Sequence, residues 1–283
     1  MAILLMLLSS AAFTTMAAMV KGLDGAIPIA ELILLRCLIP LPFFVYIIKR
    51  KGVPLLVQAK GLILLRSLAG AAAMACFYYA LTNMPIADCV FLGRSQPFFL
   101  ALLAPILIGE KAPKAAWGAI GAGLVGVFFI MKPGLAAWPI AAWASLSGAG
   151  LAALAHISVR QLNRTDQPLV IVFNFFLLTA LMAVAWSVVV ENDLVVPQGQ
   201  QWLLIVGIGV FASLGQFLMT CAYRYDKAPV VAASSYASII LSVIYGYWFW
   251  GEMPQPLAWV GALLILAGGL ILIWSRRGRG EKL

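Results

Sequence analysis

The sequence predicts an all-α polytopic membrane protein, with ten transmembrane helices arranged as two inverted five-helix repeats and with both termini in the cytoplasm. Of the 283 residues, 64% are hydrophobic and only 10% are charged, a composition typical of helical membrane proteins. Apolar runs long enough to cross a bilayer follow one another along the chain. A set of spaced residues also occurs twice, with Gly251 lying 142 positions after Gly109. These three observations predict the fold class.

Short connections that carry turn-forming and charged residues join the apolar runs, and none is long enough to separate domains. The first run has no basic residue ahead of its apolar core, which disfavours a signal peptide, so we expect it to be the first helix. We predict helices over residues 2–20, 28–48, 61–82, 86–108, 113–131, 138–159, 168–190, 201–224, 229–250 and 257–275.

Positively charged residues indicate the orientation. If the amino terminus is cytoplasmic, only Lys21 and Lys132 fall on the outer side, Arg36, Arg66 and Arg94 lie within helices, and every other Lys and Arg falls inside. The positive-inside rule therefore places both termini in the cytoplasm. The same rule accounts for the net charge of +9 without a nucleic-acid partner.

Residues of the same kind recur in equivalent places of the two halves. The pairs are Lys21 and Arg160, Pro28 and Pro168, Pro85 and Pro229, Gly109 and Gly251, Glu110 and Glu252, and Trp117 and Trp259. Because their offsets agree within a few residues, we infer a duplication, with repeats at residues 1–134 and 135–283 that form one transmembrane domain. An odd number of helices in each half requires the second half to insert upside down. Inverted repeats are the architecture of secondary transporters, whose substrate site lies near the midplane.

The run over residues 86–108 carries Arg94, Ser95, Gln96 and Pro97 near its middle. Arg94 sits eight residues in, roughly 12 Å below the surface of the hydrocarbon core, where an Arg costs at least ~2.5 kcal/mol. It must therefore face protein or water. Two interpretations stay open: a structural Arg bonded to carbonyls freed at a Pro97 hinge, or a binding site for an anionic group.

Polar side chains form stripes on two helices of the second half. Spacings of four and three place Ser234, Ser238, Ser242 and Tyr245 on one helix face, and Gln216 lies on a similar stripe of the preceding helix. In lipid such stripes turn toward other helices or water. Each Ser alone could simply tie helices together. Because the repeat relates residues 86–108 to residues 229–250, we expect Arg94 to face the serine stripe across a substrate site.

A few ionisable residues are candidates for coupling transport to an ion. Glu31 and Asp88 are the acids within the predicted helices, both within about a turn of the outer surface. His156 lies near the cytoplasmic end of its helix, and for it we favour an interhelical hydrogen bond over a proton relay.

Four other polar side chains lie within the predicted helices of the first half, and two of them are candidates for the site. Arg36 lies mid-helix, and we favour a structural role for it. Arg66 lies close to a cytoplasmic helix end and is expected to snorkel to the surface. Tyr78 and Tyr79 are candidates for stacking on a substrate, although adjacent helical residues rarely face the same way.

Several of these residues together resemble the EamA family of the drug/metabolite transporter superfamily. They are Pro28 with Arg36, Tyr79 with Ala80 and Leu81, Pro97, and residues 107–110 ahead of a glycine-rich helix. The resemblance covers nearly the whole chain and implies a transporter fold, but members move amino acids, other metabolites or drugs. The chain departs from the family at Phe13 and Thr14, where Trp and Gly are common, and near Ile239, the counterpart of Pro97. We count Phe13 and Thr14 among the candidate cavity residues.

We predict a secondary transporter that moves a small organic metabolite, an amino acid or a related anionic or zwitterionic compound, across a bacterial-type inner membrane by alternating access, with export favoured. Anionic substrates are favoured because Arg36 and Arg94 lie deep in the membrane, where exporters of cationic drugs need a carboxylate. The alternative is uptake of a larger ring-bearing solute, such as an adenosyl compound or a flavin, which rests on the aromatic residues.

Other classes of function find little support. No glycine-rich phosphate loop with Lys and Ser or Thr is present, so ATP is not the direct energy source. A membrane-embedded enzyme would need paired deep acids, a His cluster or a nucleophile with its base, and none occurs. The four Cys residues lack metal-ligand spacing. We expect the protein to bind no cofactor and no metal. Its expected partners are a small-molecule substrate and the lipid bilayer, and we expect it to be a monomer or a homodimer.

Overall fold

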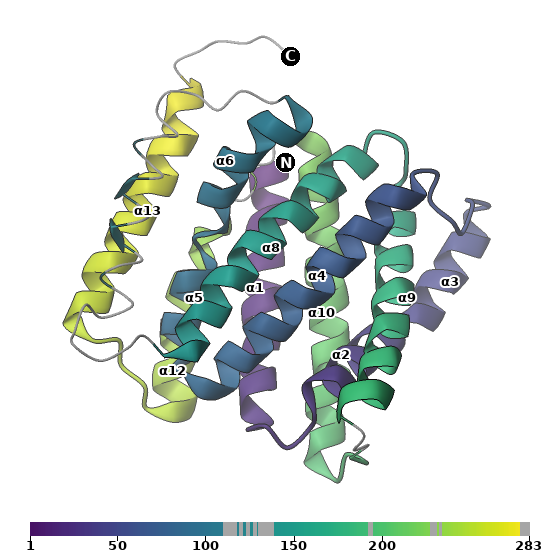
Figure 1. The fold of residues 1–283 in the computed structure, drawn as a ribbon, viewed down its shortest axis with the longest axis horizontal. Helices are drawn as coiled ribbons and strands as arrows, with labels where there is room; N and C mark the ends of the chain where they lie inside the picture. Colours follow the sequence, from purple (N-terminus) through teal and green to yellow (C-terminus); the bar gives the residue numbers. More distant parts are fainter. Residues whose placement is uncertain are drawn as a thin grey trace.

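The computed structural model describes residues 1–109, 139–191, 195–226, 231 and 234–277, together with a few isolated positions between 118 and 129. All regular secondary structure in these ranges is helical (Figure 1). The helices are α1 (Ala2–Gly22), α2 (Ile29–Leu38), α3 (Leu41–Arg50), α4 (Lys60–Asn83), α5 (Ile86–Gly93), α6 (Gln96–Ile108), α8 (Ile140–Leu162), α9 (Pro168–Trp186), α10 (Gln200–Tyr225), α12 (Ser238–Trp250) and α13 (Pro256–Arg277), with a π-helical turn η1 (Ser187–Glu191) and a 3₁₀ turn η2 (Ser234–Ala237).

Seven of the described helical segments are long and apolar enough to cross a membrane. They confirm the helices predicted over residues 2–20, 28–48, 61–82, 86–108, 138–159, 168–190 and 201–224, within a few residues at each end. The predicted helix at 257–275 corresponds to α13, and the one at 229–250 to η2 followed by the shorter α12. The helix predicted over residues 113–131 lies largely outside the described residues.

Two of the seven segments are each built from two helices placed end to end. α2 and α3 meet at Pro40, which lacks the backbone N–H that a continuous helix needs. α5 ends at Gly93, and α6 begins at Gln96, with Pro97 in its first turn where the missing N–H costs nothing. The break therefore lies at residues 94–95, just ahead of the Pro97 at which the sequence predicted a hinge.

The bundle has two chemically different ends. α1 begins, and α13 ends, at the top of Figure 1. We call this end the basic end, because most of the described Lys and Arg gather there, from α3, α4, α8 and α10. Arg160 Nη1 ties two of these helices together by donating to the carbonyl of Tyr223 at 2.9 Å.

The opposite end, which we call the far end, is closed by a cluster around Glu252. Its carboxylate forms an ion pair with Lys21 at 2.8 Å and accepts a hydrogen bond from the backbone N–H of Ile86 at 3.1 Å. Lys21 Nζ also donates to the carbonyl of Met84 at 3.0 Å. These bonds join α1, the connection between α4 and α5, the first residue of α5, and the connection between α12 and α13. Glu252 thus braces a helix junction as expected from the sequence, whereas Glu110 lies outside the described residues.

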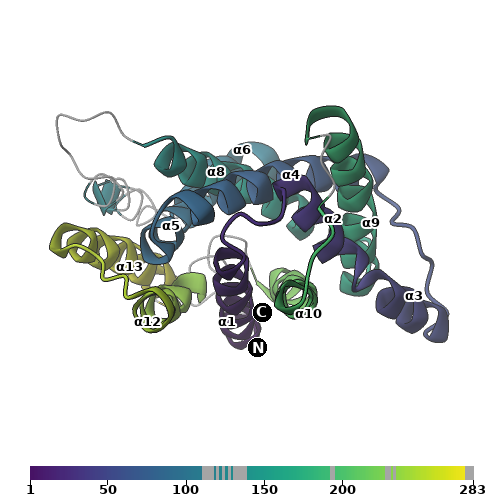
Figure 2. The ribbon, with the colours of Figure 1, turned by 90° about the horizontal axis from the view of Figure 1, so that it is seen from below.

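The helices pack in two layers, seen from below in Figure 2. α4 lies beside α8 in one layer, and α1 lies beside α10 in the other, while α2 and α9 pack together at one flank and α5 and α12 at the other. Small residues permit these close approaches: a Cβ added to Gly148 of α8 would lie 3.1 Å from the Cβ of Cys76 on α4. A Cβ on Gly215 of α10 would lie 3.1 Å from the ring of Phe13 on α1.

Candidate functional site

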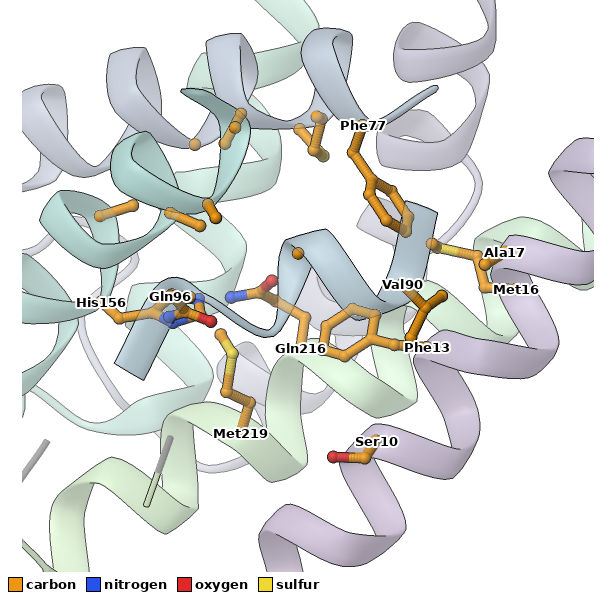
Figure 3. A pocket seen from close by; sticks show the side chains of 18 of the residues that line it. Ser10, Phe13, Met16, Ala17, Phe77, Val90, Gln96, His156, Gln216 and Met219 are labelled. Atoms are coloured by element: carbon orange, nitrogen blue, oxygen red, sulfur yellow. The ribbon is translucent and has the colours of Figure 1, made fainter. Parts of the chain in front are cut away.

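A cavity of about 180 Å³ lies between the two layers (Figure 3). Its lining comes from the middle of the long helices, from Met6 to Ala17 of α1, Arg66 to Tyr78 of α4 and Ser145 to His156 of α8. The rest of the wall comes from α2, α5, α6, α9 and α10, with Arg36, Val90, Gln96, Phe175 and Gln216 among its residues. Because each long helix contributes its central turns, the cavity sits near the middle of the membrane-spanning bundle.

Three arginines, Arg36, Arg66 and Arg94, line this cavity, and no Asp or Glu does so among the described residues. Arg36 comes from α2 and is buried. Its Nη1 donates a hydrogen bond to the Tyr78 hydroxyl at 3.2 Å and contacts the sulfur of Met74. The hydroxyl of Tyr78 in turn reaches the sulfur of Met16. Arg36 therefore makes structural contacts, as favoured from the sequence, and it also lines the cavity.

Arg94 occupies the break between α5 and α6. Its backbone N–H still bonds the carbonyl of Val90 at 3.0 Å, so the residue caps α5. Its Nη1 donates at 2.7 Å to the hydroxyl of Ser235 in η2, the turn that leads into α12 on the same flank. Ser235 in the second half therefore bonds Arg94, and it follows Ser234 of the predicted stripe directly in the sequence.

The prediction that Arg66 snorkels to the membrane surface is wrong. Its side chain is only 3% exposed and lies flat on the ring of Phe175, with the guanidinium carbon 3.8 Å from the ring centroid. Gly70, one turn deeper in α4, makes room for this placement, because a Cβ there would collide with Arg66 Nη1 and lie 2.9 Å from the Phe175 ring.

His156 lies in a polar cluster at the side of the cavity nearest the basic end. Gln96 from α6 and His156 from α8 lie side by side in Figure 3, and their side chains are hydrogen-bonded. The hydroxyl of Tyr223 also approaches His156 Nδ1 at 3.1 Å. These contacts form the interhelical hydrogen bonding favoured for this residue.

The remaining predicted residues divide between the cavity and the surrounding packing. Those that line the cavity, besides the arginines, are Phe13, Thr14, Tyr78, Gln96, His156 and Gln216. Those that do not are Ser95, Pro97, Tyr79, Ser234, Ser238, Ser242, Tyr245, Glu31 and Asp88.

Local bonding explains several of these outer placements. Ser238 and Ser242 are fully buried and donate to carbonyls of the preceding turn, at 2.9 and 2.8 Å. The Tyr245 hydroxyl bonds Thr15 of α1 at 3.0 Å. Glu31 accepts a hydrogen bond from the backbone N–H of Val195 at 2.9 Å, ahead of α10. Asp88 lies in the first turn of α5.

Three cavity residues, Arg66, Ser145 and Phe175, were not predicted from the sequence. For Arg66, the signal that could have found it is the glycine four residues later on the same helix face. For Phe175 no such signal exists, because its ring meets Arg66 only through the packing of α9 against α4.

Comparisons with known proteins agree with this architecture. A model of the EamA-like transporter family matches residues 1–132 and 139–274. A pseudopaline exporter of Pseudomonas aeruginosa is 31% identical over 98% of this chain and 97% of that protein. A riboflavin transporter of Brucella anthropi is 28% identical over 77% of this chain and 78% of that protein. An S-adenosylmethionine uptake transporter of Rickettsia felis is 24% identical over 72% of this chain and 68% of that protein. A solved crystal structure, 20% identical, aligns over 99% of both chains with a TM-score of 0.77 and has the same fold.

Proposed function

Because the chain belongs to the EamA-like transporter family, we propose that it is a secondary transporter of a small organic anion or zwitterion, such as an amino acid or a related metabolite. It moves this substrate across the inner membrane by alternating access, in the export direction. The observation that carries the proposal is the cavity lined by Arg36, Arg66 and Arg94 without an Asp or Glu among the described residues.

The electrostatics of this cavity favour an anion. A guanidinium removed from water loses hydration free energy that only an opposite charge or well-placed acceptors can offset. Ser235 and Tyr78 supply neutral acceptors to Arg94 and Arg36. A substrate carboxylate would supply charge as well, and Arg binds carboxylates through two parallel hydrogen bonds. A cationic substrate would add a further positive charge to the same space and be repelled.

The proposed architecture is ten helices in two inverted repeats, residues 1–134 and 135–283. Such a repeat makes α1 equivalent to α8, and α4 equivalent to α10. The pairing of α1 with α10 is then the same interaction as the pairing of α8 with α4. α2 and α9 are equivalent helices that meet directly, and the equivalent segments 86–108 and 229–250 meet through α5 of the first and α12 of the second. Both contacts support a two-fold axis running between the two layers.

Three smaller features support the same architecture. Arg94 and Ser235, which bond to each other, are 141 positions apart, close to the repeat offset. Residues related by a two-fold axis touch only where they lie near that axis. Because Arg94 also lines the cavity, the cavity lies beside the axis. Gly109 after α6 and Gly251 after α12 both adopt left-handed backbone conformations, with φ of 66° and 62°. The gathering of Lys and Arg at the basic end supports cytoplasmic termini.

Export is the favoured direction because a relative that matches nearly the whole chain is an exporter. Uptake of a ring-bearing solute is the second candidate. It is supported by the riboflavin and S-adenosylmethionine transporters among the relatives and by the rings of Phe13 and Phe77, which face the cavity in Figure 3.

Flux of radiolabelled solutes in proteoliposomes tests the proposal. We expect saturable movement of at least one amino acid or organic acid, and no movement of its amide. Movement of a flavin or an adenosyl compound with no movement of any acid would favour the second candidate. Absence of flux for every class would contradict a transporter of small organic solutes.

A further inference from the structure

The direction of the Arg66 side chain is unusual for its place in the membrane. Helical side chains lean toward the helix N-terminus, which for Arg66 leads to the basic end, six residues and ~9 Å away. A long basic side chain within that reach normally places its charge in the interfacial water. Arg66 instead extends the other way, beside Gly70 and onto Phe175, and so places its charge in the cavity.

The guanidinium of Arg66 is fixed in position but retains its donors. Stacking on Phe175 uses one flat face and leaves the N–H groups in the plane free to point elsewhere. No hydrogen-bond acceptor contacts it among the described residues, and its Nε is buried without one. Arg36 and Arg94, by contrast, each donate to a hydroxyl, of Tyr78 and Ser235 respectively. Arg66 is therefore the cavity arginine most open to a ligand.

Arg66 and Arg94 lie toward opposite flanks of the cavity. Phe175 holds Arg66 toward α9, on the flank where α2 and α9 pack (Figure 2). Ser235 holds Arg94 toward η2, on the flank where α5 and α12 pack. Two fixed cations at two flanks match a molecule with an anionic group near each end.

We propose that Arg66 forms a second anion-binding subsite, distinct from that of Arg94, and that the substrate carries two carboxylates. Gly70 is the positioning residue of this subsite, because any larger residue would overlap the guanidinium and crowd the Phe175 ring, so that one or both must shift. The inference rests on the proposed function, since it assigns a substrate class to the same cavity.

The test uses purified full-length protein and linear dicarboxylates from succinate to pimelate, each compared with its half-amide by isothermal titration calorimetry. We expect at least one diacid to bind about 30-fold or more tightly than its half-amide, the loss typical of an unpaired buried charge. Arg66→Gln should abolish this preference and leave the half-amide affinity unchanged, which also shows that the variant is folded. Arg66→Lys should retain part of the preference.

Gly70→Ala provides the sharper variant, because it keeps every charge. It should remove the same preference by displacing the Arg66 guanidinium and the Phe175 ring on which it lies. Arg50→Gln is the matched control, since Arg50 is an exposed arginine outside the cavity that bonds only Tyr46 among the described residues, and it should change neither affinity.

Two outcomes overturn the inference in distinguishable ways. If Arg66→Gln and Gly70→Ala leave the preference for the diacid unchanged, or if wild type binds monoacids as tightly as diacids, the second subsite does not exist but the proposed function stands. If no diacid and no half-amide binds wild-type protein, the inference and the anionic substrate of the proposed function both fail.

Discussion

At the scale of single residues, the site depends on where three arginine charges are held. Arg94 could be recognised in the sequence because a charge in the middle of an apolar run has no surface within reach. Arg66 could not, because its distance from the helix end allows snorkelling. Its direction is decided by Phe175, which approaches from a helix far along the sequence.

The hydroxyl of Ser235 orients the guanidinium of Arg94. Ser235→Ala removes the 2.7 Å hydrogen bond, so we expect the affinity for an anionic substrate to fall about 10-fold, or ~1.4 kcal/mol, as for the loss of a hydrogen bond to a charged group. Calorimetric titration with the transported acid measures the effect. Ser242→Ala is the control, because this hydroxyl bonds only its own helix among the described residues. Equal losses in both variants would show that Ser235 does not act through Arg94.

At the scale of elements, the sequence indicated most helix positions but not every helix face. Apolar length alone located the seven spans. The spacing of Ser238 and Ser242 placed them on one face, but it could not show that their hydroxyls would bond to their own backbone instead of facing the cavity. A polar stripe predicts which residues share a helix face, whereas the packing of the helices decides whether that face meets the cavity or another helix.

The contact between α4 and α8 depends on one glycine. In Gly148→Ala, the new methyl group would lie 3.1 Å from Cys76 Cβ and 3.3 Å from the Ala73 carbonyl, so α4 must give way by a few tenths of an ångström. We expect a loss of about 1–3 kcal/mol in stability, typical of overpacking, seen as a lower melting temperature in detergent. Gly150→Ala in the same helix is the control, because its methyl would lie 3.9 Å from Phe99 and should be tolerated. Equal melting temperatures for the two variants would contradict close packing at Gly148.

At the scale of the whole molecule, two features were visible in the sequence for physical reasons. Charge asymmetry between loops is expected from insertion of the chain into the membrane, and the proposed duplication accounts for the same left-handed conformation at Gly109 and Gly251. The cavity was not visible, because its walls come from several separate helices and their relative rotation is set by packing.

The proposed orientation predicts which loops an impermeant thiol reagent reaches in intact cells. In a cysteine-free background, Gln198→Cys, ahead of α10, should be labelled from outside. Lys51→Cys and Gln161→Cys, at the basic end, should be labelled only after the membrane is opened. The reverse pattern would place the termini outside, and labelling of all three from outside would contradict the order of the spans.

The most direct test of the central claim is the affinity of Arg94 variants for the transported acid and for its amide, in which the anionic group is neutral. We predict that Arg94→Gln loses about 30-fold to several thousand-fold in affinity for the acid, and far less for the amide. Arg94→Lys should retain partial binding of the acid, because it keeps the charge but loses the planar fork. If Arg94→Gln weakens both ligands equally, the arginine does not recognise the anionic group and the account is wrong.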